Sequence, residues 1–229
     1  MANIFAHRGY SSKYFENSAE AFRACTDLNI YGIENDVQLT KDGEVVVIHD
    51  EYLKRLLNVD GFIKEYNLSE LREFKYPNGE SIITLCEYLD IIKDTSLVSN
   101  VELKTTVFQY DGIEEKVYNA FKDYNMLDRL IISSFNHYSL LRFREIDKGI
   151  PLAALTATKL IDVDRYLLEN DLMIYHPLFT TIDNDIINML KNRDIMTNVW
   201  TVNDKLSYEK MIALGVDGII TNYPMLDFN

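Results

Sequence analysis

The stretch "GIENDVQLTKDGEVVVIHD", residues 32–50, decides the fold. It holds two β-branched, apolar segments on either side of the turn "KDGE", and no helical pattern separates them. This pattern predicts a β-hairpin in which a strand at 44–50 returns antiparallel to a strand at 31–37. The hairpin stands apart from the rest of the chain, where strands and helices alternate.

Seven further strand-like segments occur, at residues 3–7, 97–104, 129–135, 151–157, 172–177, 195–202 and 217–222. Helical patterns lie between most of them, and the first is expected to open with a capping box of Asn17 and Glu20. With the return strand set aside, eight βα units remain, the number that closes a parallel barrel. The strands are rich in Ile, Val and Leu without clean alternation, as in a parallel sheet buried on both faces.

We therefore predict a TIM-type (β/α)8 barrel. The alternative is an open, doubly wound sheet, but no Gly-rich phosphate loop follows the first strand. Residues 51–83 are the one long interruption, and their apolar content argues against disorder. We expect this segment to be a cap inserted after the second barrel strand, within a single domain of residues 1–229.

Composition limits the classes of partner. The net charge of −13 argues against nucleic acid, whose phosphates need clustered Lys and Arg. The longest apolar runs fall far short of the roughly 20 residues that cross a bilayer, and "MANIFAHRGY" lacks the pattern of an export signal. We expect a cytoplasmic protein without stable membrane insertion, with Cys25 and Cys86 as core thiols. The oligomeric state stays open.

Ionisable side chains gather at the ends of the predicted strands: His7, Arg8, Glu34, Asp36, His49, Asp50, Glu102 and Lys104. In a parallel α/β barrel the carboxyl ends of all strands meet at one mouth, where catalytic groups lie. Residues i and i+2 of a strand point to the same face, so Glu34 aims with Asp36. The same spacing aligns Glu102 with Lys104. Residues distant in the sequence should therefore converge.

Three converging carboxylates, Glu34, Asp36 and Glu102, are hard oxygen ligands that suit one divalent cation, Mg²⁺ or Ca²⁺. The carboxylates carry −3, whereas the cation with Arg8 and Lys104 brings +4. The resulting net charge of +1 matches a singly charged phosphodiester, which Arg8 and Lys104 can bind.

His7 and His49 flank this cluster in the predicted barrel. Histidine titrates near neutral pH, so a pair can hold one neutral base and one charged acid. Cleavage of a phosphodiester needs one group to activate a hydroxyl or water and another to protonate the departing alkoxide. We assign these roles to His7 and His49 jointly, because the sequence does not say which is the acid.

The sequence resembles the glycerophosphodiester phosphodiesterase family. The matching segments are "HRG" (7–9), "ENSAEAF" (16–22), "GIENDVQLTKDGEVVVIHD" (32–50), "LSEL" (68–71), "TLCEYL" (84–89), "VELK" (101–104), "ISSFN" (132–136), "VWTVN" (199–203) and "GVDGIITNYP" (215–224). The resemblance implies hydrolysis of glycerophosphodiesters to glycerol 3-phosphate and an alcohol. It also implies a barrel with an insertion after the second strand.

The same resemblance assigns site residues. His7 and His49 match the catalytic histidines, and Glu34, Asp36 and Glu102 match the metal ligands. Arg8 looks like the arginine that contacts phosphate, with Lys104 beside it, and Trp200 resembles an apolar wall of the substrate pocket. Apart from the resemblance, His176 is interpreted as structural, His137 receives no role, and Asp50 is interpreted as a residue that orients a neighbour or caps the loop.

Two departures from the family pattern concern the cap. Phe15 stands where the family usually has proline, and Leu56 and Leu57 in "EYLKRLLNVDG" (51–61) replace small polar residues. This Leu-rich cap suggests an alternative, a lysophospholipase D-type activity on single-chain lysophospholipids. A second alternative, from another class, is a non-catalytic module that binds phosphodiesters.

Overall fold

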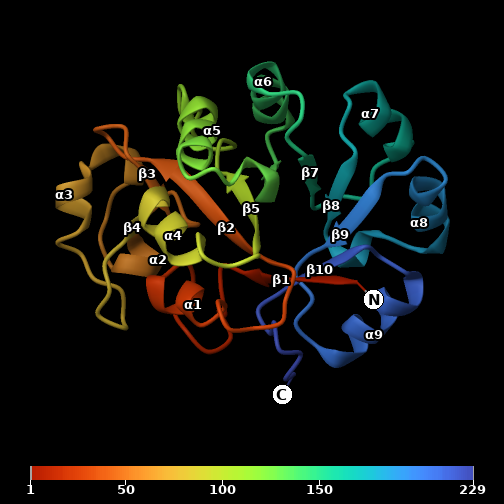
Figure 1. Cartoon of the computed structure of the whole chain (residues 1–229), viewed down its shortest axis with the longest axis horizontal. Coiled ribbons are helices and arrows are strands. Elements are labelled where there is room, and N and C mark those ends of the chain that lie inside the picture. Colours follow the sequence, from red (N-terminus) through yellow and green to blue (C-terminus); the bar gives the residue numbers. More distant parts are fainter. Residues whose placement is uncertain (1, 229) are drawn as a thin grey trace.

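A closed parallel barrel forms the centre of the molecule. In the computed structural model, which describes residues 2–228, one sheet holds ten strands, with β1 paired to both β2 and β10 (Figure 1). The eight barrel strands are β1 (Asn3–His7), β2 (Gly32–Leu39), β5 (Val98–Leu103), β6 (Leu130–Ser134), β7 (Leu152–Thr156), β8 (Ile174–Pro177), β9 (Met196–Val199) and β10 (Gly218–Thr221). The predicted barrel is confirmed.

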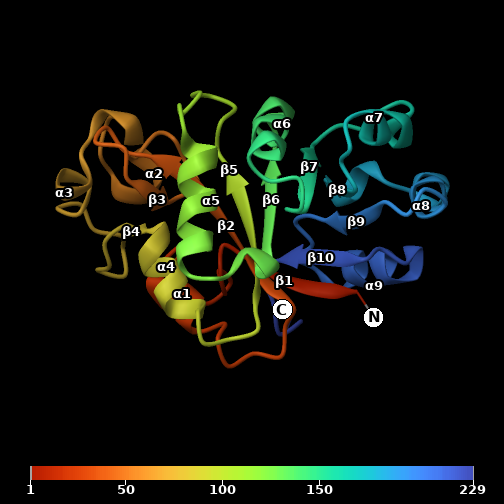
Figure 2. The same ribbon diagram turned by 45° about the horizontal axis from the view of Figure 1, so that its top comes forward.

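Helices cover the outside of the barrel. They are α1 (Ala19–Arg23), α4 (Leu85–Ile92), α5 (Ile113–Asp123), α6 (His137–Ile146), α7 (Val163–Glu169), α8 (Asn184–Lys191) and α9 (Lys205–Leu214), with short 3₁₀ turns η2 (Leu127–Arg129) and η3 (Phe179–Thr181). In Figure 2 the arrowheads of β5 and β6 point to the top of the molecule, beside α5 and α6. That end of the barrel is therefore the mouth at the carboxyl ends of these strands. Of the helices within residues 2–228, none has the length and apolar character that crossing a membrane requires.

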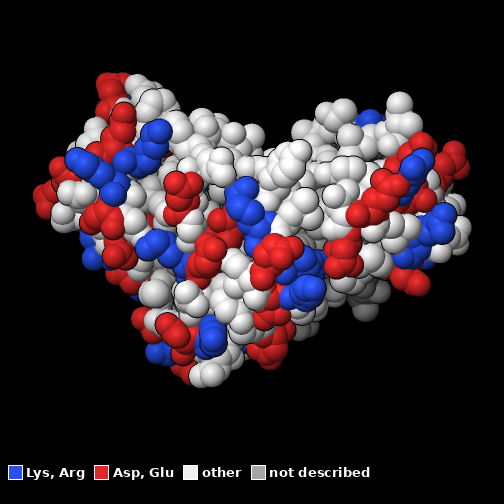
Figure 3. All heavy atoms as spheres, turned by 90° about the horizontal axis from the view of Figure 1, so that it is seen from above, with Lys and Arg blue, Asp and Glu red and all other residues white. Residues whose placement is uncertain are grey.

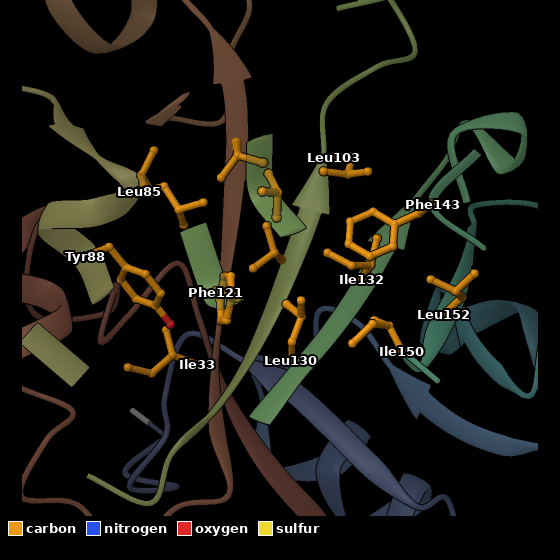
Figure 4. Close-up of a cluster of buried hydrophobic side chains, with 14 of the residues drawn as sticks. Ile33, Leu85, Tyr88, Leu103, Phe121, Leu130, Ile132, Phe143, Ile150 and Leu152 are labelled. Carbon is orange, nitrogen blue, oxygen red and sulfur yellow. The ribbon is translucent and has the colours of Figure 1, made fainter. Parts of the chain in front are cut away.

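The largest apolar cluster lies between the strands and these helices. Figure 4 shows Leu103, Leu130, Ile132 and Leu152 projecting from β5, β6 and β7 toward Phe121 of α5 and Phe143 of α6, all of them buried. Fully burying one such side chain contributes roughly 1.5–3 kcal/mol. This cluster holds the helices against the barrel and leaves the strand ends free to carry polar groups.

The hairpin has the predicted antiparallel geometry. The beginning of β2 pairs with β1, whereas its last residues, 37–39, pair with β3 (Val45–Val47). A further strand, β4 (Ile83–Thr84), pairs with β3 and brings the chain back to the barrel. Two residues are too few to give a readable pattern, which is why the sequence did not predict β4.

The insertion builds a core of its own beside the barrel. It contains α2 (Lys54–Leu57), η1 (Ile63–Glu65) and α3 (Leu68–Leu71), drawn in orange and yellow at the left of Figure 1. The buried side chains of this core are Leu53, Leu56, Leu57, Ile63, Leu71, Tyr76 and Ile82 of the insertion, together with Val46 and Ile48 of the hairpin. Phe15 stacks on Tyr76 with ring centroids 4.5 Å apart, so the aromatic residue that departs from the family pattern joins the barrel to the insertion.

Two local expectations were wrong. Cys86 is exposed, because the buried face of α4 consists of Leu85, Tyr88, Leu89 and Ile92, whereas Cys25 is buried as expected. Helix α1 is capped by Ser18, whose side chain accepts a hydrogen bond from the backbone of Ala21. Asn17, expected at the cap, instead extends toward the barrel mouth.

Candidate active site

The inward side chains of the barrel change from apolar to polar toward the mouth. Phe5, Ile131, Ala153, Ile174 and Ile220 form a buried apolar layer. Because alternate residues of a strand share a face, the positions two residues further along point inward above this layer. A pocket of about 400 Å³ lies there, lined by His7, Arg8, Glu34, His49, Asn100, Glu102, Ser133, Phe135, Leu155, Trp200, Thr201 and Ile220.

Strand register brings the three predicted carboxylates together. Asp36 of β2 is the register partner of Glu102 of β5, and Glu34 is the partner of His7. Glu34, Asp36 and Glu102 are buried, and each offers an oxygen within 4.8 Å of the other two. Asp36 Oδ1 is buried without a hydrogen-bond partner among the described residues. Three hard oxygen donors with an unsatisfied lone pair fit a divalent cation such as Mg²⁺ or Ca²⁺.

The pKa values of the three carboxyl groups are shifted in different directions. Burial and the charges of Asp36 and Glu102 raise the pKa of Glu34 well above its ordinary value. Burial also raises the pKa of Glu102, although Lys104 opposes this shift. Burial works in the same direction on Asp36, but Arg8, His49, Lys104 and the hydrogen bond from Asn17 together outweigh it and hold the pKa of Asp36 far below its ordinary value. Asp36 is therefore the firmly ionised member, and the other two carboxylates repel it.

Two cations compensate part of this negative charge. Lys104 Nζ lies 2.9 Å from Glu102 Oε1 and 3.9 Å from Asp36 Oδ1. Arg8 Nε lies 3.3 Å from Asp36 Oδ2, and the backbone N–H of Arg8 donates to Glu34 Oε2 at 3.0 Å. Arg8 has a left-handed φ of 55°, which an arginine rarely adopts and which the surrounding contacts must hold in place.

The two histidines reach the pocket from different segments, His7 from the end of β1 and His49 from the loop after β3, but are held in the same way. His7 Nδ1 lies 2.6 Å from Asn222 Oδ1, and His49 Nδ1 lies 2.6 Å from Asp50 Oδ1. Both partners are acceptors, so Nδ1 carries the proton in each ring and Nε2 is left for the pocket. Burial and then the charge of Arg8 lower the pKa of His7 to about 4. The two rings differ in the charge of the partner, which is neutral for His7 and anionic for His49.

The remaining predicted residues divide between the pocket and the core. Trp200 lines the pocket edge-on to Phe135, and its Nε1 donates to the carbonyl of His176 at 2.8 Å. His176 is buried and accepts a hydrogen bond from Asn198, and burial lowers its pKa to about 3. The Nδ1 of His137 pairs with the hydroxyl of Tyr166. The burial and contacts of His176 agree with its structural interpretation.

Several residues that shape the site received no chemical role from the sequence. Asn17 Nδ2 donates to Asp36 Oδ2 at 2.9 Å, and Asn222 orients His7. Asn222 comes directly after β10, so the rule that selected the other strand ends could have found it. Glu16 accepts a hydrogen bond from Arg8 and another from Arg55. Both Glu16 and Arg55 lie outside the barrel strands, so the search for ionisable residues at strand ends could not find them.

The surface around the mouth carries charges of both signs. Figure 3 looks down on this end of the molecule and shows acidic and basic side chains interspersed, with a large uncharged area between them. In this view the basic residues do not merge into one continuous patch.

The family model for glycerophosphoryl diester phosphodiesterases matches residues 7–226. The chain belongs to this family. A glycerophosphodiester phosphodiesterase from Caldanaerobacter subterraneus is 39% identical over 96% of this chain and 94% of its own length. The crystal structure of a glycerophosphodiester phosphodiesterase from Thermotoga maritima is 30% identical, with a TM-score of 0.81 over 99% of this chain and 96% of that one. An Oleispira antarctica phosphodiesterase, solved with the product sn-glycerol-3-phosphate, is 26% identical, with a TM-score of 0.86 over 98% of this chain and 94% of that one.

These relationships confirm the predicted family and the prediction of a phosphodiesterase. The match begins at His7 and ends beyond β10, so it includes the pocket and the insertion.

Proposed function

We propose that this chain hydrolyses glycerophosphodiesters to glycerol 3-phosphate and an alcohol, with one divalent cation, Mg²⁺ or Ca²⁺. The observation that supports this most strongly is the convergence of His7, Glu34, His49 and Glu102 on one pocket, with Asp36 beside them. The sn-glycerol-3-phosphate bound by the Oleispira antarctica relative supports a small glycerophosphodiester as the substrate class.

Glu34, Asp36 and Glu102 would hold the cation, which supplies a positive charge that stabilises the transition state of phosphoryl transfer. Arg8, kept at the mouth by Asp36 and Glu16, binds a phosphate oxygen. Lys104 balances Glu102 and Asp36, so that the site accepts an anion in spite of the acidic chain.

The hydrogen-bond partners of the two histidines favour different roles, one as general acid and the other as general base. The anionic carboxylate of Asp50 holds His49 Nδ1 at 2.6 Å, and we assign His49 as the general acid that protonates the departing alkoxide. His7, buried beside Arg8 and paired with a neutral amide, suits the general base. The attacking hydroxyl belongs either to water or to the substrate's own glycerol, and both routes use these roles.

We expect chelation to abolish the activity. Release of glycerol 3-phosphate from glycerophosphocholine should fall to background in EDTA and return on addition of Mg²⁺ or Ca²⁺, added separately to identify the ion. Full activity in chelator would contradict the role of the metal. Calorimetry that detects tight binding of the diester without turnover would instead favour a non-catalytic module.

A second candidate, hydrolysis of single-chain lysophospholipids, is supported by a groove beside the pocket. Phe135 and Leu155 line both the pocket and a neighbouring groove of about 760 Å³, whose other apolar lining includes Leu160, Ile161 and Tyr166. The leucines that first suggested this activity do not contribute, because Leu56 and Leu57 are buried in the core of the insertion.

A charge in the groove should separate the two candidates. Ile161 is 90% exposed, so Ile161→Glu should leave folding and glycerophosphocholine turnover intact. If the groove binds the chain of lysophosphatidylcholine, the variant should lose about tenfold in kcat/KM for that lipid, the loss of roughly 1.4 kcal/mol of apolar contact. Leu206→Glu, 78% exposed on α9, is the matched control. If the wild-type enzyme does not hydrolyse lysophosphatidylcholine, this candidate is eliminated.

A further inference from the structure

We propose that Arg55, supplied by the insertion, is a positioning residue that holds both His49 and Arg8 in their working orientations through Asp50 and Glu16. This inference rests on the proposed function, in which His49 and Arg8 act on the phosphodiester. It gives the insertion a role in catalysis besides covering the barrel.

The guanidinium of Arg55 binds two carboxylates at once. Its Nε and Nη2 donate to the two oxygens of Asp50 at 2.5 and 2.8 Å. Its Nη1 and Nη2 donate to the two oxygens of Glu16 at 2.9 and 2.8 Å. Both contacts are bidentate, the geometry in which an arginine–carboxylate pair is strongest and most specific in direction. An exposed ion pair usually contributes little, but a bidentate network is the recognised exception.

Each of these carboxylates also holds a site residue. Asp50 Oδ1 accepts from His49 Nδ1 at 2.6 Å as well as from Arg55. Glu16 Oε1 accepts from Arg8 Nη1 at 2.8 Å as well as from Arg55. A continuous chain of charged hydrogen bonds therefore runs from one side of the phosphate pocket, through the insertion, to the other. Arg55 is its centre, and it connects segments that are 39 residues apart.

The fold keeps Arg55 in this place. Leu53, Leu56 and Leu57 are buried in the core of the insertion and fix one side of α2. The backbone N–H of Leu53 donates to the carbonyl of Gly61 at 3.0 Å, which closes the loop that carries the helix. With its neighbours buried, Arg55 is left with its side chain 51% exposed and directed at Asp50 and Glu16.

Both carboxylates are ionised at neutral pH and therefore act as acceptors. Burial raises the pKa of each, but Arg55 together with His49 at Asp50, and Arg55 together with Arg8 at Glu16, outweigh burial, so that the pKa values of Asp50 and Glu16 lie below their ordinary values. An ionised Asp50 fixes the proton on His49 Nδ1 and turns Nε2 to the pocket. Without Arg55, the Asp50 side chain loses two of its hydrogen bonds and is free to rotate.

The test compares Arg55→Ala, Asp50→Asn and the double variant with Arg72→Ala. Arg72 is a matched control, since it also comes from the insertion and pairs with an exposed carboxylate, Glu87, away from the pocket. We expect Arg55→Ala to lower kcat on glycerophosphocholine by about 10- to 100-fold, as loss of an outer partner of a site residue usually does. KM should rise as well, because Arg8 loses the support of Glu16.

Non-additivity distinguishes positioning from general destabilisation. If Arg55 acts on His49 through Asp50, kcat of the double variant should equal that of Asp50→Asn. Arg55→Lys, which keeps the charge but cannot bind both carboxylates bidentately, should recover part of kcat and serves if Arg55→Ala fails to fold. Losses in kcat that multiply in the double variant, or an Arg55→Ala enzyme within twofold of wild type, would overturn the proposal.

A readout independent of turnover completes the experiment. The nitrogen chemical shifts of His49, measured on protein labelled in its four histidines, report which ring nitrogen carries the proton. Arg55→Ala should shift His49 toward a mixture of tautomers, whereas Arg72→Ala should not. If Arg55→Ala changes the tautomer of His49 but the wild-type enzyme does not hydrolyse glycerophosphocholine, the proposed function fails and the positioning role of Arg55 stands. Unchanged shifts in Arg55→Ala would overturn the positioning, whatever the activity.

Discussion

Replacing His49 by alanine is expected to lower kcat for glycerophosphodiesters by about 100- to 10,000-fold, the range that one general acid or base contributes. The side chain lines the pocket, is held by Asp50 at 2.6 Å and is the proposed proton donor to the leaving alkoxide. The fold should survive, because the ring is 29% exposed and does not belong to the apolar clusters of the barrel or the insertion. Release of glycerol 3-phosphate measures the effect.

Chemical rescue makes this prediction specific. An exposed ring leaves a space that opens to solvent, so added imidazole can enter it and donate a proton in place of the side chain. We expect imidazole to restore part of kcat in His49→Ala and to leave the wild-type enzyme unchanged. The loss should also shrink for a substrate whose leaving group needs no protonation, such as a nitrophenyl phosphodiester. A variant that keeps more than a third of wild-type kcat would remove His49 from the chemistry.

The barrel and its site were predictable because both follow from short-range rules. Each barrel strand before β10 is an apolar segment followed by a helix, and a single hairpin after β2 accounts for the one break in the alternation. Glu34 lies two residues before Asp36 within β2, and this spacing is sufficient to point both side chains to the same face of the strand. Strand parity and strand direction therefore determine the candidate site without any knowledge of distant contacts.

The ion-pair network lay beyond such rules. Glu16 is in a loop and Arg55 is on a helix of four residues, so neither periodicity nor a strand end indicates where their side chains point. The sequence could show that the insertion is apolar, but not that Leu56 and Leu57 face inward while Arg55 faces the mouth. Which side of α2 is buried depends on how it packs beside Val46 of β3. That packing is a tertiary contact, which local sequence patterns do not predict.

Removing the charge of Glu34 or of Asp36 should weaken metal binding in both cases but change the stability of the metal-free protein in opposite directions. Both Asp36→Asn and Glu34→Gln are nearly isosteric, and each replaces a ligand of the proposed cation by an amide. We expect both variants to bind Mg²⁺ or Ca²⁺ much more weakly and to lose most of their activity, by about 100-fold or more, since charge stabilisation of this kind supplies several kcal/mol. Calorimetric titration of the metal into the protein measures the first effect.

The stability of the metal-free protein should separate the two residues. The folded-state pKa of Asp36 lies below its ordinary value, so the ionised carboxylate stabilises the fold at neutral pH, and this contribution disappears only as the pH falls through the lowered pKa. Asp36→Asn leaves Arg8 and Lys104 without their shared partner. Breaking a buried ion pair in this way costs about 3–5 kcal/mol in the free energy of unfolding.

The ionised side chain of Glu34 has the opposite effect on the stability of the metal-free protein. Its folded-state pKa lies above its ordinary value, so the ionised side chain destabilises the metal-free fold at neutral pH, and the cost is relieved as the pH falls. Glu34→Gln removes the repulsion with Asp36 and keeps an oxygen for the backbone N–H of Arg8. We expect a gain of about 0.5–2 kcal/mol, the usual size of such relief at a functional site.

Unfolding of the wild type and of both variants by guanidinium chloride in EDTA tests the two predicted changes in stability. Opposite changes in the free energy of unfolding, with metal binding lost in both, would mean that Glu34 is kept ionised at the expense of stability because the cation requires it. Equal destabilisation by both variants would mean instead that Glu34 is part of a structural ion-pair network. Arg8 and Lys104 would then suffice to neutralise the cluster, and the argument for a cation at this mouth would lose its electrostatic basis.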